Sequence, residues 1–282
     1  MIERSASPSV SPAEHTFVFV GGLHRSGTTL LASCLAAHPA ASGFADTGAI
    51  EDEGQFLQSV YPIARQYGGP GRFGYAPAMH LTENSPLVTE TNRQRLWAEW
   101  SKFWDYRRPI LIEKSPPNLL KARFLQAMFP DARFIMVLRH PIANAFATQK
   151  WSGTRLHDLI KHWLVCNEIM LTDMRHLRRV TLLRYEDLIA NGDAELSRLH
   201  AFVGLEPQLH DLKPREGLND NYFDRWDSTF SPYRKLMIWR FEKRVNHFGY
   251  SLRHPKRLVK REIVLDRLVT AKHDAQSAPL AI

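Results

Sequence analysis

Residues 16–39 place a short apolar strand, a glycine-rich turn and a helix directly after one another, and this order constrains the fold more than any other stretch. Residues 16–20 are β-branched and aromatic, which indicates a buried strand. The turn covers residues 21–27, and a Leu- and Ala-rich helix is predicted over residues 28–37. Glycines let backbone N–H groups approach a ligand closely, and a helix N-terminus favours negative charge. The stretch therefore predicts an oxyanion-binding loop.

The glycine spacing of this loop matches that of a phosphate-binding P-loop, Gly22-x4-Gly27, with one difference. The lysine that should follow the second glycine is replaced by Thr28, and Arg25 is the one cation in the loop. An ATP-cleaving loop needs that lysine on the β- and γ-phosphates. We therefore interpret the loop as a phosphate site that does not cleave nucleoside triphosphates. The alternative is a tight strand-to-helix turn without a ligand.

Strands and helices alternate along the rest of the chain. Further short strands are predicted at residues 110–112, 133–138 and 180–183, each followed by a polar motif. Further helices are predicted over residues 85–104, 118–130, 156–177, 194–203 and 231–247. This order predicts an α/β fold, a three-layer sandwich with a central parallel sheet and helices on both faces. Such sheets bind ligands at the carboxyl ends of their strands, so we expect the four motifs to converge.

The length of 282 residues suits one large domain, which we place at residues 15–252. Residues 1–14 are rich in Ser and Pro and lack an apolar signal core, so a disordered lead is predicted. A frayed basic tail is predicted over residues 253–282. Cys34 and Cys166 are far apart and have no metal-ligand spacing, which favours a reducing, cytoplasmic location. No apolar run is long enough for an integral membrane segment.

The formal net charge of +8 suits an anionic ligand, and would also suit nucleic acid or an anionic membrane. The basic residues are spread through the motifs and the C-terminal third instead of forming one run. We therefore expect no nucleic-acid partner. No cluster of metal ligands stands out, so no metal is expected, and the sequence does not indicate an oligomeric state.

Residues 24–30, His-Arg-Ser-Gly-Thr-Thr-Leu, resemble the 5′-phosphosulfate-binding loop of sulfotransferases that use 3′-phosphoadenosine-5′-phosphosulfate (PAPS). The Arg-Ser-Gly-Thr-Thr-Leu form is similar to that of the tyrosylprotein branch, and the resemblance extends over about residues 17–249. It implies a P-loop-like fold, PAPS as the donor and 3′,5′-ADP as the product. Arg25 would then donate a bidentate pair of hydrogen bonds to the 5′-phosphate. The rest of the cradle would come from Ser26, Gly27, Thr28 and Thr29.

The stretch 137–141, Val-Leu-Arg-His-Pro, resembles the second signature of this family and implies that Arg139 binds the 3′-phosphate. The family usually has a serine eight residues later that also bonds this phosphate, and here that position is Ala147. Thr148 is adjacent and could substitute, although it points about 100° away on a helix. A surface ion pair is the alternative role for Arg139.

Three carboxylates compete for the role of catalytic base. Glu53 lies in Glu-Gly-Gln-Phe-Leu, which resembles the Glu-x-x-Phe-apolar stretch that holds the base of heparan-type sulfotransferases. Asp46 stands where the tyrosylprotein branch places its catalytic glutamate, and Glu51 is the third candidate. We prefer Glu53. The alternative is a solvated acidic loop that merely favours a helix N-terminus.

Two further motifs carry roles implied by the resemblance. Lys114, in Glu-Lys-Ser-Pro, resembles the family lysine that assists charge at the leaving group or acceptor, a role that suits a compact ammonium. Tyr185, in Tyr-Glu-Asp-Leu, resembles the tyrosine near the adenine. A polar and aromatic loop at residues 219–226 is similar to the loop that closes over the nucleotide, which assigns Tyr222, Arg225 and Trp226 to cofactor binding.

The interpretation is a PAPS-dependent sulfotransferase that transfers a sulfuryl group to a hydroxyl, with an amine as the less favoured acceptor. The acceptor is expected to be a small molecule, a lipid or a carbohydrate. The aromatic side chains of the helix at residues 85–104 form either core or an acceptor pocket. Two alternatives stay open: a P-loop kinase for a small molecule, which the missing lysine disfavours, and a non-catalytic nucleotide-binding scaffold.

Overall fold

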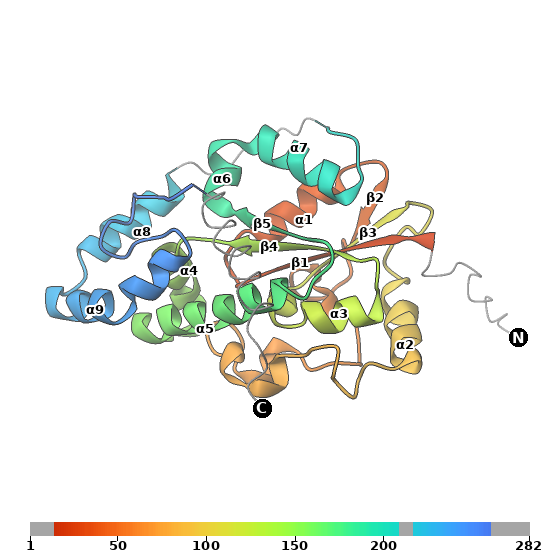
Figure 1. Ribbon diagram of the computed structural model, residues 1–282, viewed down its shortest axis with the longest axis horizontal. Coiled ribbons are helices and arrows are strands. Elements are labelled where there is room, and N and C mark those ends of the chain that lie inside the picture. The colour runs from red at the N-terminus through yellow and green to blue at the C-terminus, as the bar shows by residue number, and fades with distance from the viewer. Residues whose placement is uncertain (1–13, 209–216, 261–282) are drawn as a thin grey trace, which may run out of the picture.

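The computed structural model describes residues 14–208 and 217–260. Within these ranges five parallel strands form one sheet in the order β2-β3-β1-β4-β5 (Figure 1). The strands are β1 Thr16–Gly22, β2 Ala41–Gly43, β3 Ile110–Lys114, β4 Arg133–Leu138 and β5 Val180–Arg184. The predicted α/β fold with a central parallel sheet is confirmed.

Helices connect these strands and cover both faces of the sheet (Figure 1). The α-helices are α1 Thr28–Ala36, α2 Glu90–Trp100, α3 Ala122–Met128, α4 Pro141–Ser152, α5 Leu156–Met174, α6 Tyr185–Ala190, α7 Gly192–Val203, α8 Leu218–Asp227 and α9 Ser231–His247. The 3-10 helices are Ile50–Asp52, Gly54–Phe56, Ala64–Tyr67, Phe73–Tyr75, Pro77–Met79 and Pro116–Leu120. Most of them lie in the Gly- and Pro-rich stretch between β2 and β3, where the sequence predicts irregular structure.

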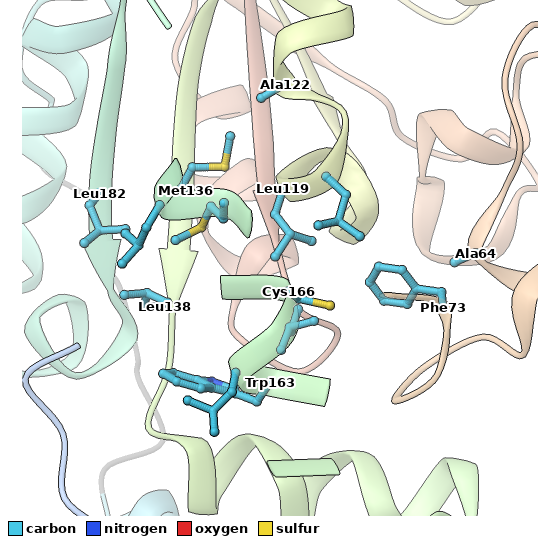
Figure 2. Packing of buried hydrophobic residues seen from close by; sticks show 14 of the residues in the cluster. Ala64, Phe73, Leu119, Ala122, Met136, Leu138, Trp163, Cys166 and Leu182 are labelled. Atoms are coloured by element: carbon cyan, nitrogen blue, oxygen red, sulfur yellow. The ribbon is translucent and has the colours of Figure 1, made fainter. Parts of the chain in front are cut away.

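The sheet separates two hydrophobic cores because side chains alternate along each strand. On β1, Val18 and Val20 pack with α1 and α7, whereas Phe17 and Phe19 pack with residues of α3 and α5 on the other face. Figure 2 shows part of this second core, where Trp163 of α5 lies near Leu138 of β4. A sheet buried on both faces explains why its strands read as continuous apolar runs.

The register of the strands brings their carboxyl ends to one edge of the sheet. Val20 of β1 pairs with Lys114 of β3, Gly22 of β1 pairs with Val137 of β4, and Leu138 of β4 pairs with Arg184 of β5. The segments that follow β1, β3, β4 and β5 therefore leave the sheet side by side. This is the convergence of motifs that the strand order predicts.

Several local predictions were wrong. The stretch 219–226 is not a loop, because it forms α8, whose aromatic side chains are buried and so favour a regular helix. Strand β2 has three small residues and was missed, as was α6, whereas the helix assumed around Thr148 is α4. Helix α2 begins later than residue 85, because Thr89 caps it by accepting a hydrogen bond from the Asn92 N–H, and it ends at Trp100 instead of residue 104.

The helix predicted over residues 118–130 does not begin at Asn118, and this residue does not cap it. Asn118 lies inside the 3-10 helix Pro116–Leu120, and its side-chain amide donates to the Val20 carbonyl, 3.2 Å away, and to Glu113. α3 begins at Ala122 instead. The longest described helix, α5, ends at Met174, three residues before its predicted end.

The two predicted terminal segments fall largely on residues 1–13 and 261–282, which lie outside the described residues. Residues 253–260 are described, and there the Val259 N–H donates to the Gly249 carbonyl at 3.0 Å. This part of the predicted tail packs on the domain. In the described ranges, no helix is both long and apolar enough to cross a bilayer.

Candidate active site

The loop between β1 and α1 has a backbone that glycine makes possible. Gly27 has φ +98°, and a Cβ atom there would lie 2.6 Å from the Tyr185 ring. A Cβ atom at Gly22 would lie 2.6 Å from the Val137 carbonyl oxygen. The loop is therefore packed tightly against β4 and the start of α6. The first N–H groups of α1, beginning at Thr28, have no partners within the helix, so they are available to donate to an anion.

Arg25 adopts φ +68°, a left-handed conformation that is costly for a residue with a side chain. Neighbouring side chains hold this strained segment. The Arg25 carbonyl accepts a hydrogen bond from Arg139 Nη1 at 2.9 Å, and Asn144 Nδ2 donates to the His24 carbonyl at 2.9 Å and to Ser26 Oγ at 3.1 Å. The Arg25 side chain itself is exposed, with its guanidinium 5.9 Å from the centre of the Trp151 ring.

A cavity of about 190 Å³ opens beside this loop. Its walls combine the phosphate-binding loop, the acidic segment after β2 and apolar side chains of other connections. The lining residues are His24, Arg25, Thr28, Thr29, Ile50, Glu51, Glu53, Pro70, Pro116, Thr148 and Trp151. The structure thus brings the predicted loop and the preferred base to one space.

Glu53, which lines this cavity, forms an ion pair with Lys114, which is not among the lining residues. Glu53 Oε1 lies 3.6 Å from Lys114 Nζ, and both side chains are buried. Lys114 Nζ also donates to the Glu51 carbonyl at 2.7 Å. Burial raises the pKa of the Glu53 carboxyl, and the positive charge of Lys114 opposes that rise. A buried carboxylate beside a cation, open to a cavity, is well placed to accept a proton.

The other two carboxylates differ from Glu53 in their surroundings. Asp46 is exposed and is not among the residues that line the cavity. Glu51 lines it but is also exposed, and its carboxylate lies 3.5 Å from the Thr29 hydroxyl, which can donate a hydrogen bond to it. Of the three candidates, Glu53 alone is buried and paired with Lys114.

A chain of buried hydrogen bonds supports Glu53 from behind. Gln55 Nε2 donates to Glu53 Oε2, and the Gln55 N–H donates to Ser115 Oγ at 2.9 Å. Ser115 Oγ donates in turn to Glu113 Oε1 at 2.5 Å. Burial raises the pKa of Glu113 to about 7. Gly54 leaves room for this contact, because a Cβ atom there would overlap the Glu113 side chain.

Two polar atoms at the cavity have no hydrogen-bond partner among the described residues, namely His24 Nδ1 and Thr148 Oγ1. Burial and the nearby charges of Lys114 and Arg25 lower the pKa of His24 to about 3. A neutral ring with so low a pKa is a poor proton acceptor. Thr148 lies with Arg25 at the cavity, and Arg139 is not among the residues that line it.

Arg139 occupies a different environment on the opposite side of the loop. Its side chain is 4% exposed, and its Nε and Nη2 atoms donate to Asn219 Oδ1 at 3.1 and 2.7 Å. Its guanidinium carbon lies 4.3 Å from the centre of the Tyr185 ring. Asn219 Nδ2 donates to Glu186 Oε1, 2.9 Å away, and Glu186 also accepts from Tyr250 at 2.9 Å. Arg139 is therefore held within the protein and is not a surface ion pair.

The three predicted cofactor residues of α8 are placed differently from one another. Tyr222 is buried and stacks on Phe146, with ring centroids 6.3 Å apart, and Arg139 lies 5.7 Å from its ring. Arg225 is exposed and lies 4.5 Å from the ring of Phe146. Trp226 is a core side chain, whose indole N–H donates to the Leu252 carbonyl at 2.9 Å. The structure brings Tyr222 near Arg139 and does not bring Trp226 there.

Sequence reasoning missed several of these contacts. Three of the missed residues lie inside the motifs themselves, namely Gln55, Glu186 and Asn219. Their place in these motifs was the one sequence feature that could have pointed to a role beside Glu53 or Arg139. Trp151 follows no motif, and nothing in the sequence marks it as a wall of the cavity. The helix with the aromatic side chains does not line the cavity, since Trp100 of α2 is core. In the described part of the chain no group of three His, Cys, Asp or Glu side chains could hold a metal.

The fold and the site define a protein of the phosphate-loop type that lacks the loop lysine. A model of the sulfotransferase family matches residues 18–211, which is more than half of the chain. The chain therefore belongs to the sulfotransferase family, and the resemblance of its motifs is confirmed.

Individual relatives are distant. Protein-tyrosine sulfotransferase A of Caenorhabditis elegans is 23% identical over 198 residues, which cover 67% of this chain and 50% of that protein. The omega-hydroxy-beta-dihydromenaquinone-9 sulfotransferase Stf3 of Mycobacterium bovis is 26% identical over 147 residues, covering 46% of this chain and 38% of that protein. The chain thus spans about half the length, or less, of the curated relatives that it matches.

A solved structure supports the fold. The sulfotransferase domain from the Synechococcus PCC 7002 olefin synthase has a TM-score of 0.52 and 18% sequence identity. The match covers 88% of this chain and 99% of that one. This likeness extends the fold assignment over nearly the whole described chain.

Proposed function

We propose that this chain transfers the sulfuryl group of PAPS to a hydroxyl, with an amine as the less favoured acceptor, and releases 3′,5′-ADP. The observation that carries the proposal is the cavity in which the Arg25 loop and the Glu53 carboxylate face the same space. Sulfuryl transfer needs an anion cradle for the donor and a base for the acceptor. The loop is proposed to supply the first and Glu53 the second.

In this proposal the loop at residues 24–29 binds the 5′-phosphate. Arg25 supplies an exposed guanidinium that can move onto the ligand, and the N-terminus of α1 supplies backbone N–H groups. Thr28 and Thr29 line the cavity and can donate hydroxyl hydrogen bonds. Thr148, whose hydroxyl has no partner among the described residues, is a further donor at this phosphosulfate and not at the 3′-phosphate.

Glu53 is proposed as the base. It accepts the proton of the acceptor hydroxyl as the acceptor oxygen attacks sulfur in line with the bridging oxygen. The bond between sulfur and that bridging oxygen breaks, and negative charge grows on the departing phosphate. Lys114 and Arg25 would neutralise that charge. In the resting site the positive charge of Lys114 also opposes the rise in the pKa of Glu53 that burial causes, and so favours the ionised carboxylate.

Arg139 is proposed to bind the 3′-phosphate, with Tyr185 and Tyr222 near the nucleotide and Arg225 at the edge. Because Asn219 occupies two nitrogen atoms of Arg139, the phosphate must replace or share this amide. Trp226 is assigned an indirect role through the packing of α8. We further propose a cytoplasmic location, supported by two free and buried cysteines, Cys34 and Cys166.

The acceptor class is proposed as a small molecule, a lipid or a carbohydrate. The cavity has apolar walls at Ile50, Pro70 and Trp151, and it is too small to enclose a large acceptor. Of the two relatives compared above, one is named for protein tyrosine and the other for an omega-hydroxylated dihydromenaquinone. An acceptor hydroxyl carried by a narrow apolar group would fit this cavity.

Calorimetric titration with 3′,5′-ADP, with ADP and with ATP and magnesium tests the donor assignment. We expect the tightest binding for 3′,5′-ADP, because the second phosphate can engage Arg139. Preference for ATP with magnesium would overturn the proposal in favour of a small-molecule kinase. Binding of 3′,5′-ADP without turnover of PAPS across an acceptor panel would favour the non-catalytic scaffold.

A further inference from the structure

Helix α9 has two faces of different character. Its inner face packs on the second core through Met237, Phe241 and Val245. Its outer face, a term used here for five exposed residues at helical spacing, is formed by Lys235, Leu236, Trp239, Arg240 and Lys243. This outer face combines large apolar side chains with cations.

The apolar side chains of the outer face are unusually open to solvent. Trp239 is 80% exposed and Leu236 is 49% exposed. Phe230, which precedes the helix, is 74% exposed. Single exposed apolar residues are common, but three large ones around one helix call for an occupant.

The charges around this face are unbalanced. Arg234 and Arg244, at its margins, are paired with Asp227 and Glu168. Lys235, Arg240 and Lys243 form no ion pair with a described residue. The outer face therefore presents cations without neutralising carboxylates.

The acidic residue of α9 does not alter this balance. Glu242 is directed toward the segment that follows the helix, where its carboxylate accepts hydrogen bonds from Ser251 Oγ at 2.6 Å and the Leu252 N–H at 2.8 Å. By helical spacing Glu242 lies seven residues from Lys235, at the edge of the outer face, but its carboxylate is already engaged by these two donors. An occupant of the outer face must supply the negative charge itself.

We propose that the outer face of α9 docks on an anionic lipid surface. Tryptophan and leucine side chains insert at the level of the headgroups, and lysine and arginine next to them attract acidic lipids. A second copy of this chain is a poorer occupant, because a symmetric contact would oppose the same three cations. Figure 1 places α9 at the edge of the molecule, away from the sheet, where a planar surface can reach it.

This surface lies outside the candidate active site, and its test does not depend on the proposed function. Full-length protein is sedimented with phosphatidylcholine vesicles and with vesicles that also contain phosphatidylserine. We expect binding to the second kind alone, weakened by added salt. The variant Lys235→Glu/Arg240→Glu/Lys243→Glu should bind at least about a hundredfold more weakly, since each lost cation contributes about fivefold and the new carboxylates repel acidic lipids.

A matched control changes the same number of charges elsewhere. Arg65, Arg95 and Lys102 are also exposed cations without a described ion pair, and the last two belong to the region of α2, at the opposite end of the view in Figure 1. Their triple change to Glu should weaken binding far less than the α9 variant. Equal losses would mean that the overall charge causes binding, and would overturn the site.

The apolar part is tested by Leu236→Ser/Trp239→Ser, which changes exposed side chains and should leave the unfolding curve unchanged. We expect it to lose most vesicle binding. Sedimentation velocity of the wild type measures whether the protein forms a dimer instead. A dimer that this variant abolishes, or absence of binding to acidic vesicles, would overturn the proposal.

Discussion

Arg25 and Arg139 follow neighbouring strands of the same sheet, and both match motifs for phosphate binding, yet their surroundings differ. The Arg25 side chain is exposed at a cavity, and its guanidinium has a ring contact with Trp151. The Arg139 side chain is buried, and its guanidinium donates to Asn219 and to the Arg25 carbonyl. One arginine is free to meet a ligand, while the other also holds the fold around it.

Two arginines from similar binding motifs can therefore differ in their contribution to stability. Arg139 also stabilises the surrounding structure, whereas the Arg25 side chain does not. Arg139 fixes the strained backbone of Arg25 through its carbonyl, so the two arginines are coupled. Changes at the cavity should separate function from stability, whereas changes around Arg139 should affect both. Three variants and one pH profile test this separation.

Glu53→Gln should lower the turnover number about a thousandfold, because general bases contribute about 10²- to 10⁴-fold. Affinity for 3′,5′-ADP should stay within about twofold, since Glu53 faces the acceptor. Steady-state kinetics with PAPS measures the effect, and Asp46→Asn is the matched control at an exposed carboxylate. Equal turnover in the two variants would remove Glu53 from the mechanism.

Arg139→Ala should lower the free energy of unfolding by about 2–4 kcal/mol, because buried acceptors on Asn219 and Arg25 lose their donor. It should also weaken 3′,5′-ADP binding. Urea unfolding measures the first effect and calorimetry the second. An unchanged unfolding midpoint would show that Arg139 has no structural role. The inferred difference between Arg139 and Arg25 would then be wrong.

Arg25→Ala should weaken 3′,5′-ADP binding about 10- to 100-fold, the range for a lost charge-assisted hydrogen-bonding group of about 1.5–3 kcal/mol. The free energy of unfolding should change by less than about 0.5 kcal/mol, because the side chain is exposed. Both quantities come from the same experiments as for Arg139. A large loss of stability in Arg25→Ala would mean that Arg25 and Arg139 both stabilise the fold.

On the acid side of the pH profile, kcat/KM should fall at a pH above the ordinary pKa range of a glutamate. Burial raises the pKa of Glu53, so the base becomes protonated, and activity falls, at a higher pH on acidification. Lys114→Met removes the charge that opposes this rise, and should move the limb to still higher pH. A limb that moves to lower pH in this variant would contradict the assignment of the pair.

The sequence predicted the phosphate loop, four strands and the convergence of their motifs, because these depend on local patterns and on the handedness of parallel connections. It could not choose among Asp46, Glu51 and Glu53, since burial and the contact with Lys114 depend on how a connection of irregular structure packs. It also missed that residues 219–226 form a helix and that Asn219 engages Arg139. Such contacts join segments 80 residues apart and have no local signature.

A crystal structure with 3′,5′-ADP would show directly whether the Arg25 loop binds the 5′-phosphate and Arg139 the 3′-phosphate. We predict the 5′-phosphate on the backbone N–H groups at the start of α1, with Arg25 turned onto it, and the 3′-phosphate on Arg139 in place of the Asn219 amide. The Glu53 carboxylate should remain free to face an acceptor in the cavity. A nucleotide bound with its 5′-phosphate away from this loop, or with Arg139 still closed by Asn219 and no contact to either phosphate, would contradict this prediction.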